Sequence, residues 1–244
     1  MDRLTINRYI QNYIKQVEQS IQEPIVYREL GTMPLDEAKA FFLLLPFLNG
    51  EEWSPVLNIS AIAVGAVHAA FDIHDRVDLL DASTKEQQLM VLSGDHFSGI
   101  HYRLLSSIPD FEFITAMSKM IGRINETKTD LFMGSFDETY AHIEAVNCIE
   151  SGCIGEFQQR YGFSKYRTIS ETALSLIWYF NQLIKDTTIH RSMTTNRLKK
   201  EKIETAISIL SGRMRKELLN ADFLTPFLKQ EIHRLANPLS GKPL

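Results

Sequence analysis

The chain has 244 residues, of which 44% are hydrophobic and 23% are charged, and its formal net charge is -4 at pH 7. This composition excludes intrinsic disorder, and the weakly acidic balance gives no electrostatic basis for nucleic-acid binding. The length suits one globular domain with a substantial core, so we expect a single helical domain over residues 1–244.

Apolar residues recur at helical spacing through most of the chain, and Pro109 is the only proline between Pro55 and Pro226. No segment alternates β-branched and polar residues as strands do, so the sequence predicts an all-α protein. The predicted helices span about 6–21, 35–47, 54–80, 83–108, 110–133, 136–161, 168–189, 198–219 and 222–236.

The helix predicted over 54–80 is apolar on nearly all sides through Val67, which indicates a buried central helix. It carries four residues that lie along one side of the helix, His68, Asp72, Asp75 and Leu79, and these form a helical stripe. Carboxylates on a buried helix each need a partner or a ligand. The stripe is therefore either an ion-paired seam, with Arg76 and the histidines as partners, or a site for a divalent metal.

The helix after it has a start signal and an unusual content of small residues. Ser83–Glu86 matches a capping box and is expected to begin this helix. Gly94 and Gly99 each cost about 1 kcal/mol of helix stability relative to alanine, so their presence suggests close helix packing. Farther along, the two carboxylates of Ile124–Asp130 lie one turn apart, an arrangement typical of a solvated face.

Several features favour a cytoplasmic location. The most apolar stretch, Ile59–Phe71, is too short to span a membrane, and the polar start of the chain is unlike a signal peptide. Cys148 and Cys153 point to different faces of one helix, so no internal disulfide is expected.

Together these tracts resemble the trans-polyprenyl diphosphate synthases, in which a helix bearing His-Asp-Asp-x-x-Asp precedes a helix bearing Leu-Ala-Gly-Asp. His74–Leu79 stands at the first position and Leu92–Asp95 at the second. The tracts that resemble the family called heptaprenyl diphosphate synthase component 1 are Asp72–Asp75, Val91–Leu105 and Ile124–Lys128. The resemblance covers about residues 55–165 and implies an isoprenoid-synthase-like helical bundle around a buried central helix.

Departures from the catalytic pattern decide which role the resemblance implies. Active synthases hold Mg²⁺ between aspartates and an allylic diphosphate, so that the diphosphate can leave. Arg76 and Leu79 replace the second and fifth residues of the first aspartate motif, and Trp178–Asp186, at the place of the second motif, has no adjacent aspartates. The family's diphosphate-binding Lys-Thr pair falls at Glu150–Ser151, and its N-terminal Gly-Lys-x-x-Arg tract has no match.

The resemblance therefore implies the regulatory or structural small subunit of a two-component hexaprenyl or heptaprenyl diphosphate synthase. Asp75 and Asp95 would be degenerate remnants, with no catalytic residue, metal ligand or cofactor in this chain. The implied partner is a larger catalytic subunit that uses Mg²⁺ to condense isopentenyl diphosphate onto farnesyl diphosphate. The chain alone would be inactive, and the product of the complex would supply the menaquinone side chain.

In homodimeric relatives two helices of each chain form the interface, and the product tunnel runs toward it. By analogy, the helices at about 110–133 and 136–161 are expected to face the partner, in a heterodimer or a larger assembly. Bulky residues there that could wall the tunnel and set product length are Phe113, Met117, Met120, Phe132 and Met133.

Two alternatives stay open. One is an isoprenoid-synthase-fold enzyme that acts alone, with a reduced Mg²⁺ site at Asp72, Asp75 and Asp95. Tight Mg²⁺ binding in the presence of a diphosphate analogue would favour it. The other is a lipid-binding or scaffolding helical protein, which would not recover a polyprenyl synthase as its main partner in a pull-down.

Overall fold

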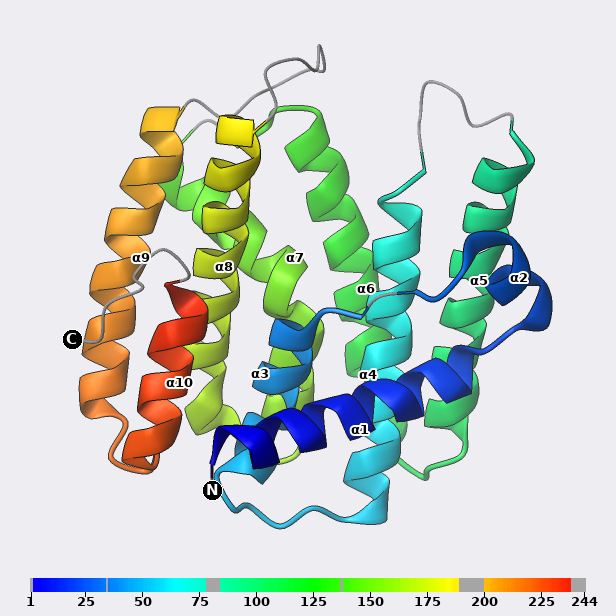
Figure 1. The fold of residues 1–244 in the computed structure, drawn as a ribbon, viewed down its shortest axis with the longest axis horizontal. Helices are drawn as coiled ribbons and strands as arrows, with labels where there is room; N and C mark the ends of the chain where they lie inside the picture. Colours follow the sequence, from blue (N-terminus) through cyan, green and yellow to red (C-terminus); the bar gives the residue numbers. More distant parts are fainter. Residues whose placement is uncertain (1, 34, 78–83, 137, 189–199, 238–244) are drawn as a thin grey trace. The chain divides into compact units, whose positions relative to one another are not determined.

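The computed structural model describes residues 2–33, 35–77, 84–136, 138–188 and 200–237 (Figure 1). Within these ranges every regular element is a helix, which confirms the predicted all-α class. The chain divides into two compact units, Met1–Thr115 and Ala116–Leu244, and each is described by itself below. The prediction that residues 1–244 act as one domain stays a prediction.

In its described residues, the first unit contains five complete helices and the first turn of a sixth. They are α1 (Arg3–Ile21), α2 (Pro24–Leu30), α3 (Glu37–Leu48), α4 (Pro55–His74), α5 (Lys85–Ser106) and the beginning of α6 (Phe111–Phe132). Side-chain oxygens cap the starts of the complete helices, and these caps are Asp2, Glu23, Asp36, Ser54 and Thr84. Each cap satisfies a backbone N–H that the first turn leaves without a partner.

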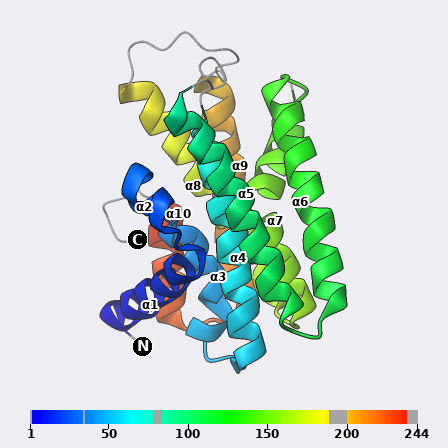
Figure 2. The same cartoon turned by 90° about the vertical axis from the view of Figure 1, so that its right-hand side faces the viewer.

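The central helix of this unit is α4, as its apolar sequence predicts. It packs against α5 along most of its length and also contacts α1 and α3; Figure 2 shows α5 alongside it. Gly65 lets α1 approach closely, since a Cβ there would lie 2.5 Å from Val17 Cγ2 and 2.6 Å from Tyr13 Oη. Tyr13 Oη then donates a hydrogen bond to the Ala61 carbonyl oxygen at 2.9 Å.

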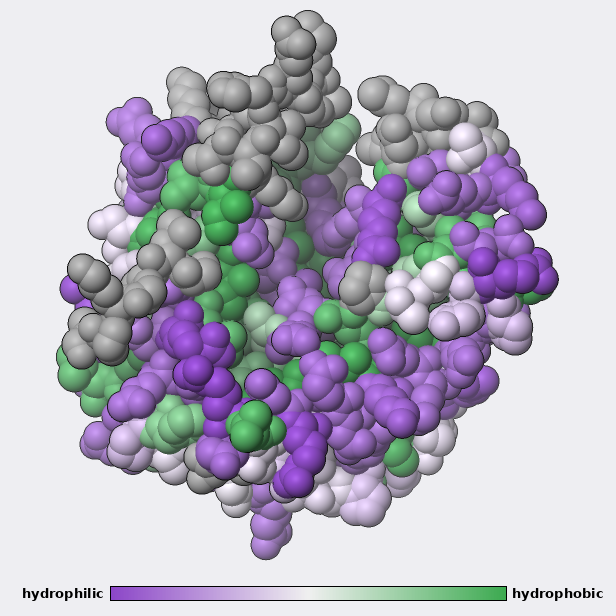
Figure 3. Space-filling view, viewed as in Figure 1, coloured by the Kyte–Doolittle hydropathy of each residue, from purple (hydrophilic) through white to green (hydrophobic). Residues whose placement is uncertain are grey.

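By length and composition alone, α4 is also the one helix in the described ranges that is long and apolar enough to cross a membrane. However, 61% of its most apolar window is buried inside the structure, as in the core helix of a globular protein. The surface over α1, by contrast, is mainly hydrophilic (Figure 3). The apolar stripe of α1 faces inward, and its buried members are Ile6, Ile10, Tyr13, Ile14, Val17 and Ile21.

Several helix boundaries differ from the predicted ones, and one short helix was not predicted. Pro24 does not merely end the first helix; it begins α2, because a proline is well suited to a first helical position. The cap of α5 is Thr84, whose side chain accepts from the Gln87 N–H, whereas Ser83 lies outside the described residues. Most important for the site, α4 ends at His74 rather than near residue 80.

The second unit holds the rest of α6 and the helices that follow it. They are α7 (Thr139–Arg160), the short 3₁₀ helix η1 (Ser164–Tyr166), α8 (Arg167–Thr188), α9 (Lys200–Asn220) and α10 (Pro226–Ala236). In this unit α8 packs against α7, α9 and α10. Buried polar pairs join α7 to α8: Asn147 accepts a short hydrogen bond from Ser175, and Gln158 donates to Ser170 at 3.0 Å.

Candidate functional site

The end of α4 and the middle of α5 bring His74 of the first tract next to Asp95 of the second. His74, in the last turn of α4, has its Nε2 atom 3.6 Å from Asp95 Oδ1 on α5. The ring lies directly over Gly94, where a Cβ would be 2.1 Å from His74 Nε2. The predicted packing role of Gly94 is thus confirmed. Gly99 has open space around it, so the same prediction was wrong for that residue.

Asp72 meets a basic group from another helix. Lys39 Nζ, on α3, lies 3.8 Å from Asp72 Oδ1, and the two side chains are 13% and 30% exposed. A partly shielded ammonium group this close neutralises the carboxylate without a metal ion. Of the two possibilities for the stripe, the geometry therefore favours an ion-paired seam. Lys39 is thus a partner that the sequence did not predict, whereas Arg76 Nη1 lies 3.9 Å from Met33 Sδ.

This pairing can be tested by a double-mutant cycle with Lys39→Met and Asp72→Asn. We expect a coupling free energy of about 1 kcal/mol from urea unfolding, because both side chains are largely shielded from water. The matched control is the exposed pair Lys200–Glu204, with a 3.7 Å separation. There we expect only about 0.3 kcal/mol. Equal coupling free energies in the two cycles would contradict the claim that the Lys39–Asp72 pair is shielded from water.

Asp75 does not share the buried environment that the sequence suggested for the stripe. It is the exposed C-cap of α4, and its backbone N–H donates to the Phe71 carbonyl oxygen at 2.9 Å. Leu79, the other end of the stripe, falls outside the described residues. In the part of the chain that the structure describes, no group of three or more His, Cys, Asp or Glu side chains is placed to hold a metal ion.

A buried histidine on α5 also contacts the backbone of α4. His101 Nδ1 lies 2.7 Å from the Ala63 carbonyl oxygen, and the ring is fully buried. Desolvation lowers the pKa of His101, which favours the neutral ring. The contact between this ring and the Ala63 carbonyl oxygen joins the two helices. His96, five residues earlier on α5, is exposed.

The bulky residues proposed for a partner interface or tunnel fall into two groups. Phe113, Met117 and Met120 are buried, with exposed fractions of 0%, 0% and 8%. Phe132 and Met133, at the end of α6, are 63% and 72% exposed. Their role in a partner interface or a tunnel stays a prediction, and the two exposed residues are the ones that a partner can reach directly.

Two residues in the remaining tracts that depart from the synthase pattern contact other groups of the same chain. Ser151 is buried, and its hydroxyl donates back to the Asn147 carbonyl oxygen at 2.6 Å. Tyr179, within the tract at the place of the second motif, lies with its hydroxyl 2.6 Å from His142 Nδ1. Outside these departing tracts, Glu126 and Asp130 are exposed on α6, as predicted for a solvated face.

This arrangement of helices defines the fold of the isoprenyl diphosphate synthases. The structure of heptaprenyl diphosphate synthase from Staphylococcus aureus matches with a TM-score of 0.70 and 13% identity, covering 95% of this chain and 98% of that one. Geranylgeranyl pyrophosphate synthase from Lactobacillus brevis matches with a TM-score of 0.67 and 12% identity, covering 96% of each chain. At these identities the similarity shows the fold alone.

The chain belongs to the family Heptaprenyl diphosphate synthase (HEPPP synthase) subunit 1, whose sequence model matches residues 27–222. It is also 30% identical over 99 residues to heptaprenyl diphosphate synthase component 1 of Geobacillus stearothermophilus. That alignment spans 41% of this chain and 45% of the relative.

Proposed function

We propose that this chain is the non-catalytic small subunit of a two-component polyprenyl diphosphate synthase. Membership of the subunit 1 family and the component 1 name of the relative both support a subunit role. The observation that carries the non-catalytic part is the pairing of carboxylates within the chain. Asp72 faces Lys39 at 3.8 Å and Asp95 faces His74 at 3.6 Å, so each of these acids meets a basic side chain of its own protein.

The physical argument concerns the leaving group. A prenyl diphosphate ionises only when the developing negative charge is neutralised, which in synthases requires Mg²⁺ held by several carboxylates. Arg76 places a positive charge where the first motif needs an aspartate, and it therefore disfavours a divalent cation there. Asp75, at the helix end, remains as a single acid beside that arginine.

Under this proposal the work is divided between two chains. A larger catalytic subunit carries both aspartate motifs and Mg²⁺ and condenses isopentenyl diphosphate onto farnesyl diphosphate. The small subunit binds it in a heterodimer or a larger assembly, supports its activity and helps to set product length. The cytoplasm is the location, and the menaquinone side chain is the end use.

The test is reconstitution with purified proteins, which measures radiolabelled isopentenyl diphosphate entering long-chain product. We expect no product from the isolated chain, and product when it is mixed with the large subunit from the same organism. Product from the isolated chain would overturn the proposal, as would equal product from the large subunit with and without this chain.

A second arm separates the proposal from a stand-alone enzyme with a reduced metal site. Arg76→Asp together with Leu79→Asp restores the first motif but leaves the later helices unchanged. The double variant alone is expected to stay inactive, because the tract on α8 still lacks adjacent aspartates. Calorimetry of the wild-type chain with Mg²⁺ and a diphosphate analogue should show no tight binding; a micromolar affinity would favour the enzyme.

A further inference from the structure

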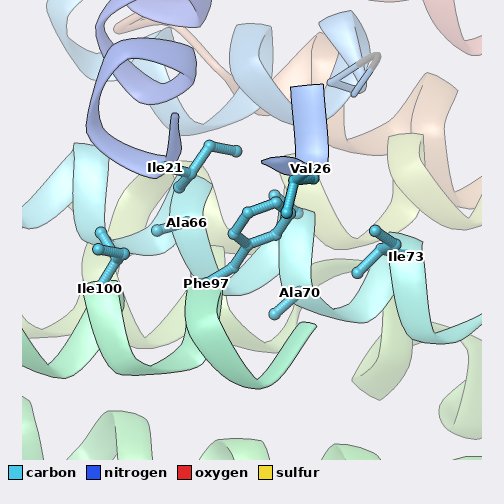
Figure 4. Packing of buried hydrophobic residues seen from close by; sticks show 8 residues of the cluster. Ile21, Val26, Ala66, Ala70, Ile73, Phe97 and Ile100 are labelled. Atoms are coloured by element: carbon cyan, nitrogen blue, oxygen red, sulfur yellow. The ribbon is translucent and has the colours of Figure 1, made fainter. Parts of the chain in front are cut away.

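A cavity of about 220 Å³ opens between α1, α2 and α5, entirely within the first unit. Its floor is formed by Ile21, Val26 and Phe97, which are only 4%, 7% and 1% exposed and belong to the hydrophobic core. Figure 4 shows the Phe97 ring lying between Ile21 and Val26. The cavity therefore reaches the apolar core of the unit and is more than a surface depression.

The walls suit an adaptable apolar ligand. Met33, in the segment after α2, is partly buried and lines one side. A methionine side chain is flexible and polarizable, so it can fit ligands of differing shape. Tyr27 lines the cavity as well and is 57% exposed, which leaves an aromatic ring available at its edge. Gly31 completes this side with a φ of 76°, which favours glycine.

The charges around the cavity nearly cancel. Lys15 contributes one positive charge and Glu18 and Glu23 contribute two negative charges. Arg76 adds a second positive charge, because its guanidinium lies 3.9 Å from the Met33 sulfur. A balanced rim around an apolar floor offers no built site for a diphosphate, so hydrocarbon rather than anion is the chemistry that this cavity recognises.

We propose that this cavity binds a short isoprenoid hydrocarbon segment. The inference rests on the proposed function, since a polyprenyl synthase subunit works among chains built from C5 units. An apolar cavity of about 150 Å³ can bind benzene, so a cavity of about 220 Å³ has room for about one or two C5 units. The cavity therefore takes part of a prenyl chain.

The experiment uses the full-length chain and geraniol, a soluble C10 isoprenoid alcohol, as the probe. Methionine methyl groups are labelled with ¹³C, and the Met33 signal is assigned by its loss in Met33→Leu. Saturable movement of the Met33 signal with geraniol is expected, with little movement of the buried Met214 signal on α9. Inorganic diphosphate should not shift the Met33 signal. Farnesyl diphosphate should shift it as geraniol does, because its hydrocarbon part enters the cavity.

Two variants test the location. Val26→Trp fills the floor and is expected to weaken geraniol binding at least tenfold, while Leu92→Trp adds the same ring at an exposed α5 position outside the cavity and should not. Tyr27→Glu places a charge at an exposed position of the cavity and should weaken binding severalfold without disturbing the fold. Circular dichroism verifies that each variant is folded.

The inference is overturned by the lack of a Met33 shift at saturating geraniol, by equal binding by folded Val26→Trp, or by a Met33 shift produced by diphosphate alone. A Met33 shift caused by the large subunit, with loss of geraniol binding, would also overturn it by making the partner the occupant. The binding assay needs no catalysis. Its failure therefore leaves the reconstitution result intact, and a failed reconstitution with normal geraniol binding identifies the proposed function as the error.

Discussion

Gly65→Ala is expected to lower the free energy of unfolding by about 2 kcal/mol, because an added methyl group has no room where α1 crosses α4. A Cβ at this position would lie 2.5 Å from Val17 Cγ2 and 2.6 Å from Tyr13 Oη. Val17 is fully buried and Tyr13 is 5% exposed, so neither side chain can simply swing into solvent. Alanine's better helix propensity, worth about 1 kcal/mol, offsets only part of this cost.

The matched control is Gly99→Ala on α5. Beyond the local backbone of α5, no atom lies within 4 Å of a Cβ built at Gly99, so only the propensity gain remains. We therefore expect this variant to be more stable than wild type by up to about 1 kcal/mol. Urea unfolding followed by circular dichroism measures both variants. A Gly65→Ala protein as stable as Gly99→Ala would show that α1 does not depend on the close approach.

The same substitution links stability to the proposed ligand cavity. Ile21, at the end of α1, forms part of the cavity floor, and the hydroxyl of Tyr13 fixes α1 to α4 through the Ala61 carbonyl oxygen. An α1 helix displaced from Gly65 loses this hydrogen bond and shifts the wall. Weakened geraniol binding is therefore expected in Gly65→Ala but not in Gly99→Ala.

The sequence predicted most of the fold because the relevant signals are local. The helix predicted over 54–80 is apolar on nearly all sides through Val67, which indicated a buried central helix, and α4 is that helix. The ends of the helices were harder to predict. The tract after His74 keeps helical spacing, yet the helix stops there, since the spacing of side chains alone does not report where backbone hydrogen bonding ends. The short α2 was missed because Pro24 was taken only as a stop signal.

The candidate site was predictable only in part, for a related reason. Gly94 could be assigned a packing role from the unfavourable propensity of glycine in a helix, and the His74 ring lies over it. The partner of Asp72 could not be assigned, because Lys39 lies 33 positions earlier on α3 and no spacing rule connects them. Only tertiary packing brings this ammonium group and carboxylate together. That contact is the observation that favours an ion-paired seam over a metal site.

Acid should destabilise the protein through His142, by about 3 kcal/mol between pH 7 and pH 4. His142 is 4% exposed and packs beside the rings of Trp178 and Tyr179. Desolvation, and then the nearby Lys202 charge, lower the pKa of His142 from 6.5 to about 4. Below pH 6.5 the His142 side chain becomes protonated in the unfolded chain but stays neutral in the folded chain. Stability is therefore lost as pH falls toward 4.

The magnitude follows from the two pKa values. Each pKa unit corresponds to about 1.36 kcal/mol, so a pKa of 6.5 in the unfolded chain and about 4 in the folded chain gives about 3 kcal/mol. His142→Gln removes the titrating group. It is expected to lose stability at pH 7 through poorer packing but to show a flatter profile below it. The advantage of wild type over this variant should therefore shrink by about 3 kcal/mol from pH 7 to pH 4.

Tyr179→Phe serves as the control that separates burial from hydrogen bonding. It removes the hydroxyl that lies 2.6 Å from His142 Nδ1 but leaves the histidine enclosed by the same rings. Because burial is the largest cause of the lowered pKa of His142, this variant should keep the acid sensitivity of wild type. Lys202→Met removes the second cause and should reduce that sensitivity. An acid profile of His142→Gln as steep as that of wild type would place the sensitivity in other groups.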